Sequence, residues 1–271
     1  MQVQAYLDRV GFVGSPRADL ESLRALHRAH LRAVPYENFD VLLGRPMTLT
    51  PEAAFDKIVG ARRGGWCYEM NGLFAAVLRE IGFTVTEMAG AVTRGERGEL
   101  SHGNHLVLRV DLDRPYLADV GFGDGTQEPL PLKLGPHRCA GYNFRLEKLP
   151  DGWLRFHNHT FGGAPYFDFR DEPADRAQLA RTCQWLATSP ESVFTQTALA
   201  FRHGPDGVAS LLGRTLRKVR PGGRESHLIG SQDEFVQVLE EVFDLHVPEA
   251  AGLWPTICAK HEELFGMDAP A

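Results

Sequence analysis

The sequence predicts an α+β protein in which helices come first, short strands follow, and a mixed segment ends the chain. Before Gly82 the apolar residues recur at helical spacing, and after it they alternate in short segments separated by turn residues. From residue 193 on, a hairpin signal precedes a capped helix. We therefore divide the chain into a helical region, 1–83, a β-rich region, 84–192, and a mixed region, 193–271.

Three helices are expected in the first region. The first is the run PRADLESLRALHRAHLRAV, and the second is LTPEAAFDKIV, with Thr50 as its cap and Pro51 in its first turn. The third, CYEMNGLFAAVLREIG, begins at Cys67 and stops at Gly82. The apolar stripes are Leu20, Leu23, Leu26 and Leu31 in the first helix, and Leu73, Val77 and Ile81 in the third.

Alternating apolar segments define the second region, and a hairpin and a helix define the third. The hairpin is centred on RPGGRE, and the helix SQDEFVQVLEEVF begins with a capping box between Ser231 and Glu234. The expected strands are TVTEMAGAV, HLVLRVDL, PYLADVGF, YNFRLEKL, WLRFHNHT and YFDFR. The expected buried face of the helix is Phe235, Val238, Leu239 and Val242.

Composition excludes several classes of protein. The chain has 29 basic and 35 acidic residues, a net charge of −6, so a nucleic-acid partner is not supported. The most basic run, RTLRKVR, is expected to be a solvated amphipathic strand or helix. No signal peptide or membrane span is visible, which predicts a cytoplasmic protein without a membrane partner. A monomer or homodimer is expected. The four cysteines lie far apart and are expected to be free thiols.

A single cysteine at a helix start is the first chemical signal. In RRGGWCYEMNG, Cys67 stands where the unpaired N–H groups and the helix dipole stabilise a thiolate. We expect Gly64 and Gly65 to allow a tight turn and a close approach of substrate to the sulfur. A lone cysteine is more often a small core residue, so its partners decide between the two interpretations.

Possible partners lie in SHGNHLVLRVDLDRPYLADVGFGDG. If the two apolar segments pair as a hairpin through DLD, Val110 lies opposite Arg114, and His105 lies opposite Asp119. Both side chains then point to the same face, where the carboxylate can hold the imidazole. Taken separately, His105 could be a core histidine and Asp119 a turn acid.

Other motifs carry weaker signals. His102 is a rival to His105, although it is expected in a loop, and His157 and His159 are expected at the surface or on an edge strand. Without a carboxylate or thiol at ligand spacing, a metal site is improbable, and none is assigned. GFGDG lacks the third glycine and the helix of a dinucleotide-binding loop, so we expect an open loop beside the cysteine, with Phe122 in a pocket wall.

Taken together, these motifs resemble those of the arylamine N-acetyltransferase family. RGGWCYEMN, HLVLRV and ADVGFG match its cysteine, histidine and aspartate motifs, and VPYENFD is similar to its PFENL segment, with Tyr36 and Phe39 in place of phenylalanine and leucine. The resemblance covers essentially the whole chain. It implies an N-terminal helical bundle, a central β-barrel-like domain and a C-terminal α/β lid around a cysteine-protease-like triad.

The resemblance also implies a reaction and its residues. Cys67, His105 and Asp119 would be the catalytic triad, and acetyl-CoA would donate an acetyl group to an arylamine, hydrazine or N-hydroxyarylamine through an acetyl-cysteine. The implied acceptor-binding residues are Phe122, Tyr36 and Val92, and the implied coenzyme A-binding residues are Asn104, Phe122 and Gly123. Two alternatives stay open at this point: a cysteine hydrolase or transglutaminase-like enzyme with the same triad, and a binding protein that has lost the chemistry.

Overall fold

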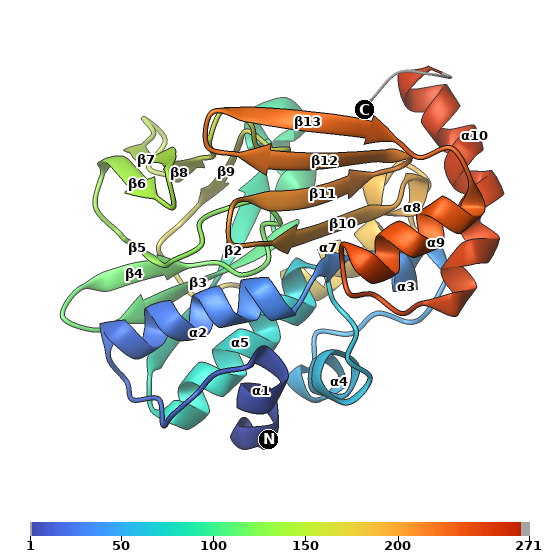
Figure 1. The fold of residues 1–271 in the computed structure, drawn as a ribbon. Helices are drawn as coiled ribbons and strands as arrows, with labels where there is room; N and C mark the ends of the chain where they lie inside the picture. The colour runs from blue at the N-terminus through green and yellow to red at the C-terminus, as the bar shows by residue number, and fades with distance from the viewer. Residues whose placement is uncertain (1, 267–271) are drawn as a thin grey trace.

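A computed structural model describes residues 2–266 of the chain. Figure 1 shows N-terminal helices below, strands on the left, and a second sheet with two helices above and to the right. The N-terminal elements are α1 (Val3–Val10), α2 (Leu20–Ala33), β1 (Tyr36–Glu37), α3 (Phe39–Leu42), α4 (Pro51–Phe55), the π-helical turn η1 (Asp56–Gly60) and α5 (Cys67–Ile81). The expected helices are present, and α1 and α3 are additional.

An eight-stranded antiparallel sheet occupies the middle of the chain, with strand order β5-β4-β3-β2-β9-β8-β7-β6. Its strands are β2 (Thr84–Val92), β3 (His105–Asp111), β4 (Pro115–Ala118), β5 (Leu130–Pro131), β6 (Gly135–Cys139), β7 (Tyr142–Lys148), β8 (Leu154–His157) and β9 (Tyr166–Phe169). Between β2 and β3 lie α6 (Arg94–Arg97) and η2 (Gly98–Ser101). All six alternating segments thus contain strands, because side chains of period two suit a sheet with one buried face.

The C-terminal sheet has the order β1-β10-β11-β12-β13. Its elements and the surrounding helices are α7 (Arg176–Thr188), α8 (Val193–Gln196), β10 (Leu199–His203), β11 (Val208–Leu212), β12 (Thr215–Arg220), β13 (Gly223–Leu228), α9 (Gln232–Glu241), η3 (Pro248–Leu253) and α10 (Trp254–Phe265). The expected hairpin is β12–β13, in which Arg220 pairs with Gly223. A mixed α and β fold with a central, barrel-like sheet is therefore confirmed.

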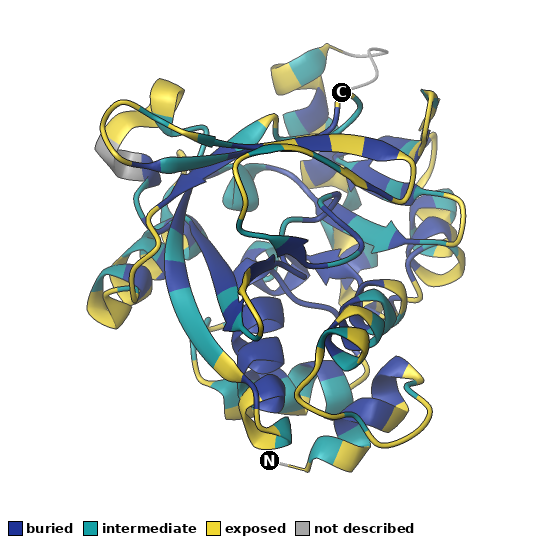
Figure 2. Cartoon of the chain, turned by 90° about the vertical axis from the view of Figure 1, so that its left-hand side faces the viewer, coloured by how far each residue is buried: buried dark blue, intermediate teal, exposed yellow. Residues whose placement is uncertain are grey.

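Helix α5 is the centre of the molecule. Eleven of its 15 residues are buried, and it packs against β2, β3, α1 and α4. Figure 2 shows this buried interior enclosed by elements whose outer faces are exposed. The apolar core around α5 joins the N-terminal helices to one face of the large sheet, and a second core lies between the C-terminal sheet and α9. The first residues of α5 are therefore fixed in position by the packing of the helix against several elements.

Some sequence expectations differ from the structure. Helix α7 lies inside the range expected to be β-rich, and β1, in the helical range, pairs with β10 of the C-terminal sheet. Thr50 precedes α4 as expected, but its side chain bonds Thr48 instead of the helix. Ser231 caps α9, whereas Glu234 accepts from the main-chain N–H of Gly230, one residue before the cap. The division at residues 83 and 192 stays a prediction.

Candidate active site

Cys67 is the first residue of α5 and is 2% exposed. The preceding residue, Trp66, has extended backbone angles, and its N–H donates to the carboxylate of Glu69 at 3.1 Å. This bond satisfies a group at the helix start, and Gly82, with φ of 108°, ends the helix in the left-handed region. The thiol therefore stands among main-chain N–H groups that no residue of the helix can pair.

The two glycines before the cysteine allow other segments of the chain to pack closely against the backbone at positions 64 and 65. The turn is made by Arg62, with φ of 52°, and neither Gly64 nor Gly65 has a positive φ. A Cβ on Gly64 would collide with the main-chain oxygen of Pro35, and one on Gly65 would lie 2.9 Å from the Cβ of Glu69. Neither glycine is needed for a positive φ in the turn, and both permit close packing; the expected access of substrate to the sulfur stays a prediction.

The glycine that approaches the cysteine comes from the distant GFGDG loop. A Cβ on Gly121 would lie 2.7 Å from the Cα of Cys67 and 2.7 Å from Nδ2 of Asn71. A larger residue at this position would push the loop away from the helix start. Gly121 therefore sets how closely the loop packs against Cys67.

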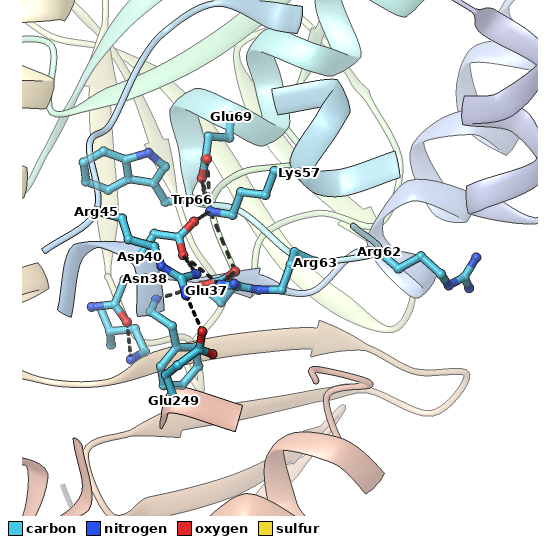
Figure 3. Close-up of polar contacts among 12 residues, drawn as sticks. Glu37, Asn38, Asp40, Arg45, Lys57, Arg62, Arg63, Trp66, Glu69 and Glu249 are labelled. Carbon is cyan, nitrogen blue, oxygen red and sulfur yellow. Dashed lines mark hydrogen bonds and ion pairs between the residues drawn. The ribbon is translucent and has the colours of Figure 1, made fainter. Parts of the chain in front are cut away.

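A set of paired charges supports the segment before Cys67 (Figure 3). We call it the charge network; its members are Glu37, Asp40, Lys57, Arg63 and Glu69. Arg63 contacts Glu37 at 2.6 Å and Asp40 at 3.1 Å, and Lys57 contacts Asp40 at 2.8 Å and Glu69 at 2.9 Å. Burial opposes ionisation of Asp40, but Lys57 and Arg63 outweigh it and lower the pKa of Asp40 to about 2.

His105 and Asp119 meet, although in a different register from the expected one. The structure pairs Val110 with Tyr116 and Asp111 with Pro115, two residues away from the expected pairing. Proline lacks an N–H and suits the first position of a strand, which is where Pro115 lies. Asp119 follows the end of β4, and its Oδ2 lies 2.7 Å from Nε2 of His105.

The imidazole of His105 is buried between an acid and the thiol. Burial disfavours its charged form, but Asp119 and then Cys67 outweigh burial and raise the pKa of His105 to about 10. Because Nε2 faces Asp119, Nδ1 is the nitrogen that serves Cys67. This arrangement favours the protonated form of the imidazole beside the thiol.

Asn71 ties the carboxylate to the helix that bears the thiol. Its Nδ2 donates to Oδ1 of Asp119 at 2.8 Å, and its Oδ1 accepts from the N–H of Val120 at 2.9 Å. The N–H of Gly121 also donates to Oδ1 of Asp119. Sequence reasoning assigned Asn71 no role, yet it lies four residues after Cys67, on the same face of α5, which is a readable signal.

Three buried histidines hold the loop that follows Asp119. We call residues 119–127 the histidine-held loop. Nε2 of His27 accepts from the N–H of Asp119, so its Nδ1 carries the proton and donates to the oxygen of Gln127 at 3.0 Å. His159 donates to the oxygen of residue 124 at 3.1 Å, and His203 donates to that of residue 123 at 2.9 Å. The histidines come from α2, the β8–β9 connection and β10.

These histidines hold the loop in their neutral form. Burial lowers the pKa of His27 and of His203 to about 4, and it also lowers the pKa of His159. The expectation that His159 lies at the surface is wrong, since it is 5% exposed; His157 instead contacts Glu147. No sequence signal pointed to these contacts.

A cavity of about 390 Å³ opens onto the thiol. The predicted residues Tyr36, Val92, Asn104 and Phe122 line it with Cys67 and His105. Of the described residues that form its wall, Gly123 is not one; it lies at φ of 82° with its oxygen bound by His203. Further wall residues come from the C-terminal sheet and were not expected: Leu199, Phe201, Ser210, Leu212, Arg217 and Val219.

The remaining candidates lie elsewhere. His102 bonds Gln178 of α7 through Nδ1, and its ring lies 4.7 Å from that of Trp153. In residues 2–266, no three acids, histidines or cysteines are grouped as metal ligands, and no helix there is long and apolar enough to cross a membrane. Cys139, Cys183 and Cys258 are free thiols, like Cys67.

A thiol, an imidazole and a carboxylate in this order can carry out acyl transfer through a covalent intermediate. The thiol attacks an acyl carbon, the imidazole moves the proton, and the carboxylate orients the imidazole. The cavity beside the thiol is lined mostly by apolar and aromatic residues, as is usual for small organic substrates.

Comparison with known proteins identifies the relatives of the chain. A family model described as N-acetyltransferase matches residues 19–251. An arylamine N-acetyltransferase of Mycolicibacterium smegmatis is 35% identical over 266 residues, which cover 93% of this chain and 94% of the relative. Arylamine N-acetyltransferase 1 of Homo sapiens is 33% identical, covering 90% and 94%.

Solved structures similar to this chain are also arylamine N-acetyltransferases. The structure of Mycobacterium marinum arylamine N-acetyltransferase in complex with CoA matches with a TM-score of 0.86 and 32% identity. The match covers 97% of this chain and 99% of that chain.

Proposed function

The chain belongs to the arylamine N-acetyltransferase family, and from this premise we propose that Cys67, His105 and Asp119 are the catalytic triad of an acetyl-CoA-dependent arylamine acetyltransferase. The observation that carries the proposal is the 2.7 Å contact between His105 and Asp119, with the other ring nitrogen left for Cys67. Acetyl-CoA is the donor, and the residues assigned to each step are the proposal.

In the first step the Cys67 thiolate attacks the carbonyl carbon of acetyl-CoA. The tetrahedral intermediate collapses, the bond between the carbonyl carbon and the CoA sulfur breaks, and His105 gives its proton to the leaving CoA thiolate. The main-chain N–H of Cys67, at the start of α5, is the proposed donor to the oxyanion. The products are acetyl-Cys67, free CoA and a neutral imidazole.

In the second step an arylamine attacks the acetyl carbon of acetyl-Cys67. His105, now neutral, accepts the amine proton, and Asp119 supports the resulting imidazolium. The intermediate expels the Cys67 thiolate and releases the N-acetylated amine, which restores the starting ion pair. Hydrazines and N-hydroxyarylamines present equivalent nucleophilic atoms and are included in the proposed acceptors.

The cavity suggests where the substrates lie. We assign Phe122, Tyr36 and Val92 to the acceptor, since all three line the space beside the thiol. Asn104, Phe122 and Gly123 are assigned to coenzyme A by the family resemblance; the first two line the cavity, and Gly123 does not. Asn104 is fixed to β2 beside the proposed acceptor residue Val92. Its Oδ1 accepts from the N–H of Val92 at 2.8 Å, and its Nδ2 donates to the oxygen of Val92 at 3.3 Å. A cytoplasmic location and a monomeric or dimeric state stay predictions.

Acetylation of the enzyme in the absence of amine tests the mechanism. Mixing the protein with acetyl-CoA should release about one CoA per chain in a burst, because each chain has one such thiol. Mass spectrometry of the quenched protein should find one acetyl group, on the peptide that contains Cys67, and added arylamine should discharge it. Intersecting double-reciprocal lines, with no trapped acetyl-enzyme, would instead indicate direct transfer in a ternary complex.

A further inference from the structure

A tyrosine lines the cavity beside the thiol where the similar family segment has phenylalanine. Tyr36 lies on β1, is 7% exposed, and forms part of the same cavity wall as Cys67. Within residues 2–266 its hydroxyl takes part in no hydrogen bond. A phenylalanine ring would fill the same space and would carry no polar atom that needs a partner. Packing therefore does not account for the hydroxyl of Tyr36.

The other tyrosines of the chain are all hydrogen-bonded. The sequence has six tyrosines, and in five of them the hydroxyl has a partner within the protein. These partners are His30 for Tyr6, the oxygen of Gly103 for Tyr68, Asp113 for Tyr116, the oxygen of Val219 for Tyr142 and the N–H of Gly95 for Tyr166. Tyr36 is the exception, and it is the tyrosine that lines the cavity at the proposed nucleophile.

The backbone and the ring of Tyr36 are fixed next to the cysteine segment. Tyr36 forms a parallel bridge with Gly65, two residues before Cys67, and the N–H of Glu37 donates to the oxygen of Gly65 at 2.9 Å. Glu37 is in turn held by the charge network. On the other side, the ring meets Phe201 edge to face, with the ring centroids 5.6 Å apart. The hydroxyl is therefore positioned before any substrate arrives, as a donor in a catalytic site requires.

The hydroxyl lies near the sulfur without being bonded to it. The one hydrogen bond of the Cys67 Sγ within residues 2–266 is to the main-chain oxygen of Asn104, at 3.9 Å. Burial and then Cys67 raise the pKa of Tyr36 well above its usual range, so the phenol keeps its proton at neutral pH. A protonated donor close to the sulfur but free of it is suited to an atom one bond beyond the sulfur–carbon bond. In an acyl group on Cys67, that atom is the carbonyl oxygen.

We propose that the Tyr36 hydroxyl donates a hydrogen bond to the oxyanion of the tetrahedral intermediate on Cys67, as the second donor beside the main-chain N–H of Cys67. The inference rests on the proposed function and adds a catalytic residue to it. When the bond between Sγ and the acyl carbon forms, the electron pair of the C=O double bond moves to the oxygen. The phenol keeps its proton throughout, and the electron pair returns when the bond to the leaving group breaks.

The same oxyanion forms in both steps, so one hydroxyl serves both. His105 moves the protons in each step, and Tyr36 only stabilises the charge on oxygen. The ring of Tyr36 can still line the space proposed for the acceptor, because the hydroxyl alone takes part in the chemistry. Removal of the hydroxyl should therefore slow the two half-reactions together.

Tyr36→Phe tests the proposal, because it removes one oxygen atom and introduces the residue of the similar family segment. The burst of CoA release and the discharge of acetyl-Cys67 by an arylamine are timed separately by rapid quenching. Each rate constant should fall about 100-fold, the usual cost of losing one donor to an oxyanion. Tyr116→Phe removes the hydroxyl of a tyrosine outside the cavity wall and should change neither rate constant.

Alkylation of Cys67 by iodoacetamide separates the proposed role from others, because this reaction forms no oxyanion. Its rate and its pH dependence should be the same in Tyr36→Phe and the wild type. If alkylation slows together with acetylation, or its pH profile shifts, the hydroxyl acts on the thiolate or on the structure, and the proposal is overturned. If the discharge slows while CoA release does not, Tyr36 binds the acceptor amine, which also overturns it.

An activated ester keeps the proposal distinct from the proposed function. 4-Nitrophenyl acetate can acetylate Cys67 without CoA or arylamine, and the release of 4-nitrophenolate follows the same oxyanion-forming step. If the wild type does not react with acetyl-CoA, but Tyr36→Phe slows the reaction with the ester about 100-fold, the proposed function fails and the role of Tyr36 stands. If acetyl-CoA is used and Tyr36→Phe reacts at the wild-type rate with both donors, the proposed function stands and the role of Tyr36 is refuted.

Discussion

The charge network and the histidine-held loop support the two halves of the proposed triad in opposite ways. Beneath Cys67, three acids and two bases that are largely buried contact one another as ion pairs. Beside Asp119, buried histidines are neutral and bind main-chain groups. A buried charge is tolerated when it has a partner, whereas a buried histidine is tolerated when it stays uncharged. The two regions should therefore fail under different conditions, which the following variants can show.

The largest effect is expected where the two regions meet, at Asp119. Asp119→Asn should leave the protein folded but slow acetylation of Cys67 by about 10⁴-fold, because the amide can hold the wrong tautomer of His105 and cannot support an imidazolium. The rate of the burst of CoA release measures the rate of Cys67 acetylation. Asp113→Asn, in the exposed turn between β3 and β4, is the control. Near-normal activity of Asp119→Asn with loss in Asp113→Asn would refute the assignment.

A smaller effect, on stability, is expected in the charge network. Arg63→Met leaves Glu37, which is fully buried, without its closest partner and should cost about 3 kcal/mol of unfolding free energy in urea titrations. Arg62→Met is the matched control, because Arg62 is exposed and points away from the network (Figure 3). It should stay within about 0.5 kcal/mol of the wild type. Equal losses in both variants would show that the network contributes little.

The smallest effect is expected from pH and belongs to the histidine-held loop. Unfolded, His203 titrates near pH 6.5, whereas burial lowers the pKa of folded His203 to about 4. Between these values the unfolded chain binds the proton first, so stability is complete above pH 6.5 and falls as the pH drops toward 4. In this pH range the unfolding free energy of the wild type should fall more steeply than that of His203→Gln. The two slopes should differ by about 1 kcal/mol per pH unit, since the amide can keep the bond to Gly123 without titrating.

The contrast with the network sharpens this test. Asp40, with a pKa of about 2, loses its contribution only between pH 3.8 and 2, just below the range in which His203 loses its own. His137→Gln replaces a partly exposed histidine outside the loop and should leave the slope unchanged. An identical slope in the wild type and His203→Gln would mean that His203 does not hold the loop as a neutral donor.

Much of the fold and part of the site were predictable from local pattern. Helix α5 begins at Cys67 and ends at Gly82 as expected, and the alternating segments are strands, because side-chain period and capping residues act over a few neighbours. The contact between His105 and Asp119 was also predicted, since hairpin neighbours are close in sequence. Its register was not, because a three-residue turn fits VDLDRP in more than one position and Pro115 selects one of them.

By itself, the sequence determined the secondary structure around the cysteine, the presence of a thiol, an imidazole and an acid near one another, and the family. Only the tertiary structure decided what supports and surrounds them. His27 and His203 reach the histidine-held loop from 80 and more residues away, and Arg217 reaches the cavity across four strands. Periodicity and turn chemistry describe neighbours along the chain, whereas these contacts depend on which distant surfaces bury one another. That choice is made by the packing of the whole core around α5.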